Sequence, residues 1–345
     1  MKSEYYDGTK LLSLKDLNGN EPEIYISTSN RSAGKTTYFS RLLVNRFIKY
    51  GEKFAIIYRF NYELDGCADK FFKDIKTLFF NGYEMKSKRM AMGIFHELFL
   101  NGGSCGYAIS LNSADQLKKY SHFFSDVQRM LFDEFQSETN HYCPKEVEKL
   151  ISIHTSIARG QGSMCRRVPV YMISNTVSLL NPYYTELGIA ERLTSNTKYL
   201  RGDGFVMEQG FVEKASKAQL ESGFNRAFSN NRYVAYSSQN VYLNDNRTFI
   251  EKPSGNNRYI CTLKYNGCEY GIREFQELGI VYCDDRPDLS FPNKITVTTE
   301  DHEVNYVMLK RSSLILENLR YFFEHGCFRF KNLASKEAVL KSLSY

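Results

Sequence analysis

The chain has 345 residues, of which 42% are hydrophobic, and this length predicts two domains that each bury a core. It contains no run of about 18 apolar residues and no apolar segment near its first residue, so we expect neither a membrane span nor secretion. A formal net charge of +6 permits a polyanionic partner without requiring one, while eight cysteines without a Cys-x-x-Cys pair favour reduced cytoplasmic thiols over disulfides or a zinc site.

The first predicted elements are a strand over 23–28, a loop over 29–36 and a helix that stops at Gly51. The loop reads Ser-Asn-Arg-Ser-Ala-Gly-Lys-Thr, which matches the phosphate-binding pattern Gly-x-x-x-x-Gly-Lys-[Ser/Thr] except that Ser29 replaces the first glycine. In such a loop, backbone N–H groups bind a triphosphate, Lys35 reaches the β- and γ-phosphates, and the Thr36 hydroxyl ligates Mg²⁺. The alternative is a Ser/Gly-rich turn that happens to precede a lysine. The remaining loop residues expected at the nucleotide are Asn30, Ser32, Ala33, Gly34 and Thr37.

Strands and helices then alternate to about Leu200, which predicts a sheet with helices on both faces. The predicted elements are a strand over 54–58, a helix over 69–80, a β-rich insertion with strands over 94–100 and 105–110, a strand over 127–132, a helix that Pro144 opens and a strand over 168–173. The apolar face expected for the Pro144 helix consists of Val147, Leu150, Ile151 and Ile157. Arg59, directly after the second strand, is counted among the residues expected to contact the nucleotide.

The strand over 127–132 continues into Asp133 and Glu134, a second nucleotide signal. An aspartate at the end of a strand that neighbours the loop strand can hold Mg²⁺, and the following glutamate can polarise the attacking water. In isolation, two acids in this place more often mark a solvated strand end. Their position about a hundred residues after the loop favours the functional interpretation, and the pair favours a hydrolase over a kinase. Ser174 and Asn175, after the next strand, are expected near the γ-phosphate, although a plain strand-to-loop turn would also explain them.

Arg159 ends the Pro144 helix and precedes a glycine-rich loop, Gly-Gln-Gly-Ser. An arginine on such a loop could reach the triphosphate of a neighbouring subunit and stabilise charge in the transition state. A solvated cation favoured by the helix macrodipole is the simpler alternative from the residues alone.

The second half of the chain differs in pattern. Residues 202–246 hold one amphipathic segment near 212–228 and a polar run, which predicts a partly helical linker. Strands are then expected over 258–265, 269–273 and 279–283, the first two joined by the hairpin signal Asn266-Gly267, followed by a helix that stops at Gly326. Three strands and a helix resemble the start of a ribonuclease H-like fold. We therefore expect an α/β phosphate-loop ATPase domain over 1–203, a helical linker over 204–240 and a smaller α+β domain over 241–345.

Several stretches together resemble the DNA encapsidation ATPases of φ29-type tailed phages (podoviruses). They are Asn-Arg-Phe-Ile-Lys-Tyr-Gly-Glu at 45–52, Phe-Asp-Glu-Phe at 132–135, Ser-Asn at 174–175 with Asn-Pro-Tyr at 181–183, Phe-Ile-Glu-Lys at 249–252 and Tyr-Asn-Gly at 265–267. The resemblance implies an ASCE-type (RecA-like) ATPase domain that uses ATP and Mg²⁺, and a C-terminal domain like a degenerate ribonuclease H nuclease. It also implies a homo-oligomeric ring, expected to be a pentamer, which pumps double-stranded DNA through the portal of a procapsid in the host cytoplasm. The resemblance leaves open whether a structural packaging RNA is a further partner.

Carried over by position, the loop arginine of this family is Arg31, its water-activating glutamate is Glu134 and its trans-acting arginine finger is Arg159. Ser29 and Ser32 depart from the family, whose members carry glycine there. Asn61 stands where a basic residue is expected after Arg59, so that residue's role is not transferred. A further basic residue aligns only loosely, near Lys118 and Lys119, where it could contact DNA or a neighbouring subunit.

The C-terminal domain is expected to lack nuclease activity, because two-metal cleavage requires clustered carboxylates. The first strand of this domain carries Lys264 and no acid, and Asp284 and Asp285 are more typical of a solvated turn. The alternatives left open are a RecA-like helicase or a terminase with an active nuclease and, from another class, a phosphate-loop kinase. A non-enzymatic DNA-binding protein fits the two nucleotide motifs least well.

Overall fold

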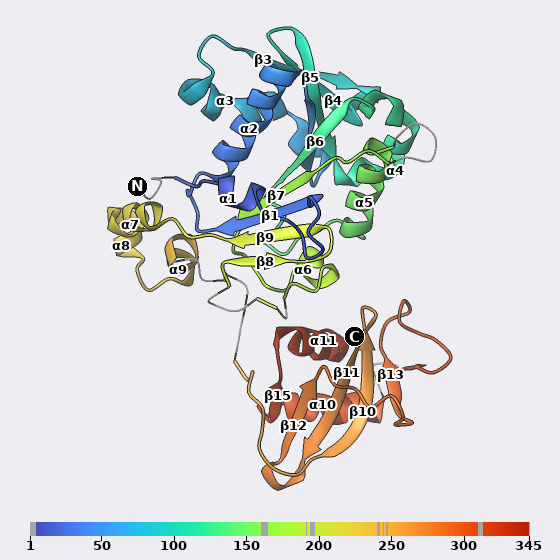
Figure 1. Cartoon of the computed structure of the whole chain (residues 1–345). Helices are drawn as coiled ribbons and strands as arrows, with labels where there is room; N and C mark the ends of the chain where they lie inside the picture. The colour runs from blue at the N-terminus through green and yellow to red at the C-terminus, as the bar shows by residue number, and fades with distance from the viewer. Residues whose placement is uncertain are drawn as a thin grey trace. The chain divides into compact units, whose positions relative to one another are not determined.

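The computed structural model describes residues 5–159, 165–190, 192–193, 197–239, 242–243, 245, 248–309 and 313–344. The chain divides into two compact units, Met1–Asn244 and Asp245–Tyr345, and each is described by itself (Figure 1). None of the helices within the described ranges has the length and apolar character needed to cross a membrane.

A nine-stranded sheet forms the centre of the first unit, in the order β3-β4-β5-β2-β6-β7-β1-β9-β8. Neighbours from β5 to β9 in this order are parallel, whereas β3, β4 and β8 join the sheet by antiparallel pairing. Parallel strands are buried on both faces, which explains their nearly continuous apolar sequences. The strands are β1 (Ile24–Ser29), β2 (Lys53–Tyr58), β3 (Met85–Met90), β4 (Phe95–Leu100), β5 (Gly103–Ser110), β6 (Val127–Asp133), β7 (Val170–Asn175), β8 (Tyr199–Arg201) and β9 (Phe205–Gln209).

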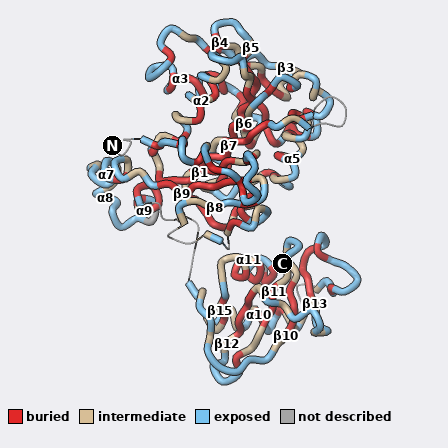
Figure 2. Tube along the Cα trace, viewed as in Figure 1, coloured by how far each residue is buried: buried red, intermediate tan, exposed pale blue. Residues whose placement is uncertain are grey.

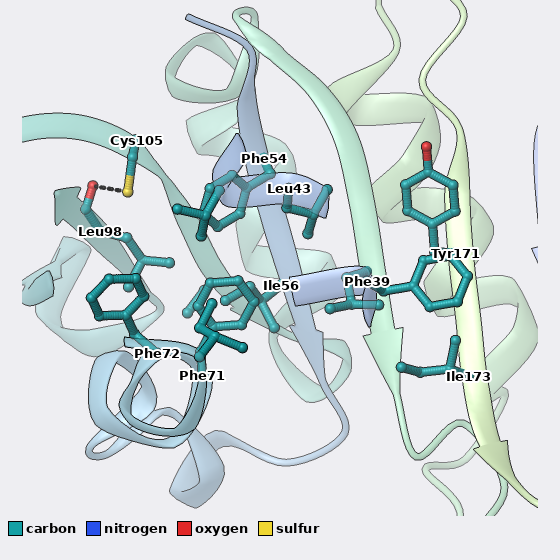
Figure 3. Packing of buried hydrophobic residues seen from close by; sticks show 14 of the residues in the cluster. Phe39, Leu43, Phe54, Ile56, Phe71, Phe72, Leu98, Cys105, Tyr171 and Ile173 are labelled. Carbon is teal, nitrogen blue, oxygen red and sulfur yellow. Dashed lines mark hydrogen bonds between the residues drawn. The ribbon is translucent and has the colours of Figure 1, made fainter. Parts of the chain in front are cut away.

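Helices lie on both sides of the central strands, as predicted (Figure 1). On one side, Phe39 and Leu43 of α2 (Lys35–Tyr50) pack with Phe71 of α3 (Cys67–Phe79) and Tyr171 of β7 in one buried cluster (Figure 3). Buried residues follow the central strands (Figure 2). The other helices of this part are α1 (Thr9–Leu12), α4 (Ala114–Leu117), α5 (Glu146–Ile157) and α6 (Pro182–Glu186), with 3₁₀ turns at Asn61–Leu64, Ala91–Gly93, Leu111–Ser113 and Lys118–Phe124.

Two details of the first unit differ from the sequence prediction. Strand β3 was not predicted, because it is an edge strand whose side chains are mostly exposed and charged. The apolar face of α5 is also shifted: Ile151 is 56% exposed, while Ile153, which was left out of the predicted face, is buried. The helix begins at Glu146 rather than at Pro144, and its buried residues Glu146, Leu150, Ile153 and Ile157 follow one another at helical spacing, which places Ile151 outside the buried face.

The linker predicted over 204–240 contains a strand of the first sheet. Its residues 205–209 form β9, which pairs in parallel with β1, the strand that leads into the phosphate-binding loop. Only five residues long and flanked by Gly202, Gly204 and Gly210, this strand has a weak local signal, and its partner is far away in sequence. After β9 the chain forms α7 (Glu213–Glu221), α8 (Gly223–Ala227) and α9 (Arg232–Gln239), so the single predicted amphipathic segment is two helices. We call α7, α8 and α9 the linker helices.

The second unit contains a six-stranded sheet in the order β14-β13-β10-β11-β12-β15. The predicted hairpin is present, and Asn266 and Gly267 at its turn both have positive φ, +50° and +73°. The expected helix does not follow the third strand directly, because two short parallel strands come first. The elements are β10 (Arg258–Tyr265), β11 (Cys268–Phe275), β12 (Ile280–Asp284), β13 (Lys294–Thr296), β14 (Val307–Met308), α10 (Leu314–Glu324), β15 (Phe328–Phe330) and α11 (Leu333–Ser344), with a 3₁₀ turn at Gln276–Leu278.

Candidate functional site

The loop between β1 and α2 has the course that phosphate binding requires. The strand ends at Ser29 and the helix begins at Lys35. Ser32 and Gly34 have positive φ, +60° and +96°, so the backbone turns sharply just before the helix. The first N–H groups of a helix have no partner within the helix and remain available to an anion at this turn.

Lys35 lies inside this loop and donates to its oxygens. Its Nζ is 2.7 Å from Ser29 Oγ, 3.3 Å from the carbonyl oxygen of Asn30 and 3.5 Å from Asn175 Oδ1. Burial lowers the pKa of Lys35 to about 8, and the negative charge of Asp133 partly offsets this decrease. The serine that replaces the usual glycine is therefore a direct hydrogen-bond partner of the loop lysine.

Asp133 is the last residue of β6, and Glu134 follows it at the same edge of the sheet. Burial and the neighbouring charge of Glu134 raise the pKa of Asp133 to about 6, while a hydrogen bond from the Thr36 hydroxyl opposes this increase. Glu134 is exposed and has a φ of +54°, a conformation uncommon for a residue with a side chain. Thr36 and Asp133 thus meet beside Lys35, as the motifs predicted.

Strand β6 is not the direct neighbour of β1, which corrects the predicted adjacency. Strand β7 lies between them, and its end brings Asn175 opposite Ser29 and Ser174 opposite Thr28. The Asn175 side chain reaches Lys35, but the Ser174 hydroxyl donates to the carbonyl oxygen of Asn175 at 2.8 Å. Of this predicted pair, only Asn175 places its side chain at the loop lysine.

Arg59 has partners other than the phosphate-binding loop. Its buried guanidinium donates to Glu146 Oε2 at 2.9 Å and to the carbonyl oxygen of Phe135 at 2.7 Å, with weaker bonds to the carbonyl oxygen of Glu134 at 3.3 Å. Glu146 also accepts a hydrogen bond from Tyr183. This network connects the segment after β6 to the start of α5, so the contacts of Arg59 indicate a supporting role rather than the predicted nucleotide contact.

The linker helices and Val212, the residue directly before α7, contact three consecutive loop residues, a feature that the motifs did not predict. Asn30 exchanges two hydrogen bonds with the backbone of Val212, at 2.9 and 3.1 Å. The backbone N–H of Arg31 donates to the carbonyl oxygen of Ser237 in α9 at 3.0 Å. Gln219 of α7 donates from its side-chain nitrogen to Ser32 Oγ at 3.0 Å. The loop is therefore attached to the segment that leads towards the second unit.

The Arg31 side chain extends this attachment. Its guanidinium forms an ion pair with Glu138 at 3.4 Å and a hydrogen bond with the Tyr233 hydroxyl. Glu138 in turn accepts hydrogen bonds from Tyr233 at 3.2 Å and from Tyr236 at 2.7 Å. Glu138 comes only four residues after Glu134. The contacts among Arg31, Glu138 and the two tyrosines therefore join α9 both to the phosphate-binding loop and to the segment that follows Asp133 and Glu134. No sequence pattern marks these tyrosines.

The remaining predicted residues lie outside this cluster. Arg159 is exposed after the end of α5 and forms an isolated backbone bridge with Cys165, while residues 160–164 of the glycine-rich loop lie outside the described residues. Lys118 and Lys119 are exposed at the start of a 3₁₀ turn, where Lys118 is 3.5 Å from Asp115. Thr37 is in the first turn of α2, and Ala33 accepts a hydrogen bond from the backbone of Tyr6.

The two acids considered for a nuclease site, Asp284 and Asp285, each form an ion pair. Asp284 lies 3.2 Å from Arg273, and Asp285 pairs with Lys331. In the part of the chain that the structure describes, no group of three or more His, Cys, Asp or Glu side chains is placed to hold a metal ion.

The chain is similar to known proteins over nearly its whole length. A family model described as podovirus DNA encapsidation protein (Gp16) matches residues 1–343. The chain is 27% identical to the DNA packaging protein of Bacillus phage phi29 over 100% of this chain and 97% of that protein, and 27% identical to the one of Bacillus phage B103 over 88% and 90%. Among solved structures, a chain of the bacteriophage Phi-29 viral genome packaging motor assembly has the same fold, with a TM-score of 0.71, 24% identity and coverage of 99% of this chain and 98% of that chain.

Proposed function

The chain belongs to the podovirus DNA encapsidation protein (Gp16) family, and we propose that in this role it hydrolyses ATP to move double-stranded viral DNA into a procapsid. One observation carries the proposal. Lys35, Thr36 and Asp133 converge where parallel strands end, beside a helix N-terminus that can bind phosphate. This is the arrangement that holds a nucleoside triphosphate and its metal in phosphate-loop enzymes.

The residues at this edge fit a magnesium ion. The Thr36 hydroxyl and the Asp133 carboxylate are hard oxygen donors side by side. Burial and the adjacent charge of Glu134 raise the pKa of Asp133, and a bound cation would stabilise the charged form of this carboxylate. A bound Mg²⁺ would neutralise charge on the transferring phosphoryl group. Lys35 would leave its loop oxygens to bind the β- and γ-phosphates, with Asn175 beside it.

We assign the water-activating role to Glu134. It follows the magnesium aspartate directly, its side chain is exposed, and Arg59 holds its backbone carbonyl oxygen. A carboxylate within hydrogen-bond reach of the attacking water can accept its proton.

Arg159 is proposed to act on a neighbouring subunit. Its exposed place after α5 is compatible with a side chain that reaches outward, and an arginine supplied in trans stabilises transition-state charge. The assembly that this requires is a ring, proposed to be a pentamer, at the portal vertex of the procapsid in the host cytoplasm. Contacts with DNA phosphates would suit a motor that must move along any sequence.

The test is ATP hydrolysis by the purified full chain with and without double-stranded DNA. We expect DNA to stimulate hydrolysis, and Glu134→Gln to abolish it while nucleotide binding is retained. Mixing Glu134→Gln subunits with Arg159→Ala subunits should restore part of the activity, because each mixed interface can combine an intact glutamate with an intact arginine. Absence of complementation at every mixing ratio, despite ring assembly, would remove the assignment of Arg159. Failure of the wild-type chain to hydrolyse ATP would remove the proposal as a whole.

The second unit is proposed to lack nuclease activity. Asp284 and Asp285 are engaged with Arg273 and Lys331, which supports a structural use of both acids. Incubating plasmid DNA with Mg²⁺ or Mn²⁺ should leave it intact. Cleavage that disappears in Asp284→Ala would instead favour a terminase-like nuclease.

A further inference from the structure

Gln136 lies two residues after Glu134, and its buried carboxamide reaches a different part of the candidate site. Its Oε1 accepts hydrogen bonds from the backbone N–H groups of Val177 at 3.1 Å and of Ser178 at 2.9 Å. These two residues come shortly after Asn175, whose side chain reaches the loop lysine. Gln136 therefore connects the segment that carries Glu134 to the segment that carries Asn175.

The backbone at Glu134 requires support from its surroundings. Its φ of +54° is uncommon for a residue with a side chain, and conformations of this kind persist where neighbouring groups fix them. Arg59 donates to the carbonyl oxygens of Glu134 and Phe135, at 3.3 and 2.7 Å. Gln136, the next residue, is bonded to the backbone after β7. Side-chain hydrogen bonds thus hold three consecutive residues of this segment in place.

The nitrogen of the same carboxamide indicates that stability alone does not explain this glutamine. Gln136 Nε2, Thr28 Oγ1 and the Tyr184 hydroxyl are buried and have no hydrogen-bond partner among the described residues. The three groups are neighbours: burial raises the pKa of the Tyr184 phenol well above its usual value, and the side chains of Thr28 and Gln136 oppose this increase. A buried polar atom without a partner destabilises a fold. What the glutamine adds is the connection that its oxygen makes.

We propose that Gln136 is a positioning residue for hydrolysis: its carboxamide oxygen fixes Glu134 relative to Asn175, and hence the attacking water relative to the γ-phosphate. The inference rests on the proposed function, because it takes Glu134 as the group that activates water. It goes further by assigning a task to a residue outside both nucleotide motifs. A misplacement of about 1 Å between reacting groups can lower a rate about a hundredfold, so one side chain that sets this separation can control turnover.

The test is steady-state ATP hydrolysis by the full chain in the presence of double-stranded DNA. Gln136→Met keeps the size of the side chain and removes the accepting oxygen. We expect it to lower kcat by about tenfold or more and to change KM for ATP by less than about twofold, because the groups that bind the nucleotide are unaltered. Gln136→Glu, which keeps an oxygen at this position, should hold kcat within about threefold of the wild-type value.

A second variant keeps the test valid if the methionine disturbs folding. Gln136→Asn retains a carboxamide but is one methylene shorter, so its oxygen falls short of the backbone after β7 and kcat should again fall selectively. Gln128→Met is the matched control, because Gln128 is exposed at the start of β6, at the opposite end of this strand from Asp133. Its kcat should equal that of the wild-type chain.

Three results would overturn the positioning role and leave the loop function standing. They are a wild-type kcat in Gln136→Met or Gln136→Asn, an equal loss of kcat in Gln136→Glu, and a rise in KM that matches the fall in kcat. If the wild-type chain does not hydrolyse ATP, the proposed function fails instead.

Discussion

Lys35 Nζ lies 2.7 Å from Ser29 Oγ, so the residue that replaces the first glycine of the loop binds the loop lysine directly. A glycine at this place would leave the lysine only backbone oxygens and Asn175 within reach. The hydroxyl thus stabilises this position of Lys35, and it competes with any phosphate that needs the same ammonium group.

Removing that hydroxyl should favour nucleotide binding. We expect Ser29→Ala to tighten MgATP binding about three- to tenfold, because a hydrogen bond of about 1 kcal/mol no longer competes with the phosphates for Lys35. Titration calorimetry measures the change. Ser174→Ala is the matched control, since each of these serine hydroxyls also donates to the carbonyl oxygen of the following residue. Equal affinities for Ser29→Ala and the wild-type chain would contradict the competition.

Asp133 should make the nucleotide-free protein less stable as the pH rises through about 6. Its pKa is raised from 3.8 to about 6, so between these values the native state holds a proton that the unfolded chain has lost. The stabilising contribution of that proton is present at low pH and is lost above the folded pKa. Asp133→Asn should therefore melt higher than the wild-type chain at pH 7.5, with a difference that shrinks towards pH 4. Melting curves at several pH values provide the measurement, and a pH-independent difference would count against the raised pKa.

The ion pair between Arg59 and Glu146 should be costly to break. Both side chains are buried, and removal of one partner from a buried pair costs about 3–5 kcal/mol because the other charge remains uncompensated. Glu146→Gln should lower the free energy of unfolding by an amount approaching this range, as measured by urea denaturation. Lys15→Ala, which breaks an exposed ion pair with Glu21 in the same unit, should cost less than about 1 kcal/mol. If the two variants lost similar amounts of unfolding free energy, burial of the ion pair would not determine the cost of breaking it.

Glu138 should hold α9 against the phosphate-binding loop. It accepts hydrogen bonds from two tyrosines of this helix and pairs with Arg31. We expect Glu138→Gln to weaken this charged group and to increase amide hydrogen exchange over Arg232–Gln239. Glu221→Gln, which alters an exposed pair with Lys217, should leave exchange in α9 unchanged. If Glu138→Gln left amide hydrogen exchange in α9 unchanged, the backbone contacts of α9 alone would hold this helix against the loop.

The sequence predicted most of the local geometry of the candidate nucleotide site, because a few residues in a fixed order dictate that geometry. Ser29 to Thr36 forms its turn from adjacent residues, and Asp133 and Glu134 follow a strand that its own apolar side chains specify. The insertion of β7 between β1 and β6 could not be predicted in this way, because strand order depends on contacts between segments far apart in the chain.

The parts that were missed depend on the same kind of distant contact. β9 is a short run between glycines that becomes a strand because β1 is available beside it. Arg59 comes directly after a strand, which is a common position for a residue that contacts a nucleotide. Its guanidinium instead forms an ion pair with the buried carboxylate of Glu146 in α5. The attachment of the linker helices to Asn30, Arg31 and Ser32 joins residues about 180–206 positions apart, and no local pattern marks it.

The backbone bridge between Arg159 and Cys165 offers a natural labelling position. Cys165 and Cys268 are the exposed cysteines among the described residues, and Cys327 is half-buried. With Cys268 and Cys327 changed to serine, a thiol-reactive fluorophore would attach mainly at Cys165, at the base of the segment that carries the proposed finger. Its emission would report when that segment meets a neighbouring subunit, without any new cysteine placed near the nucleotide.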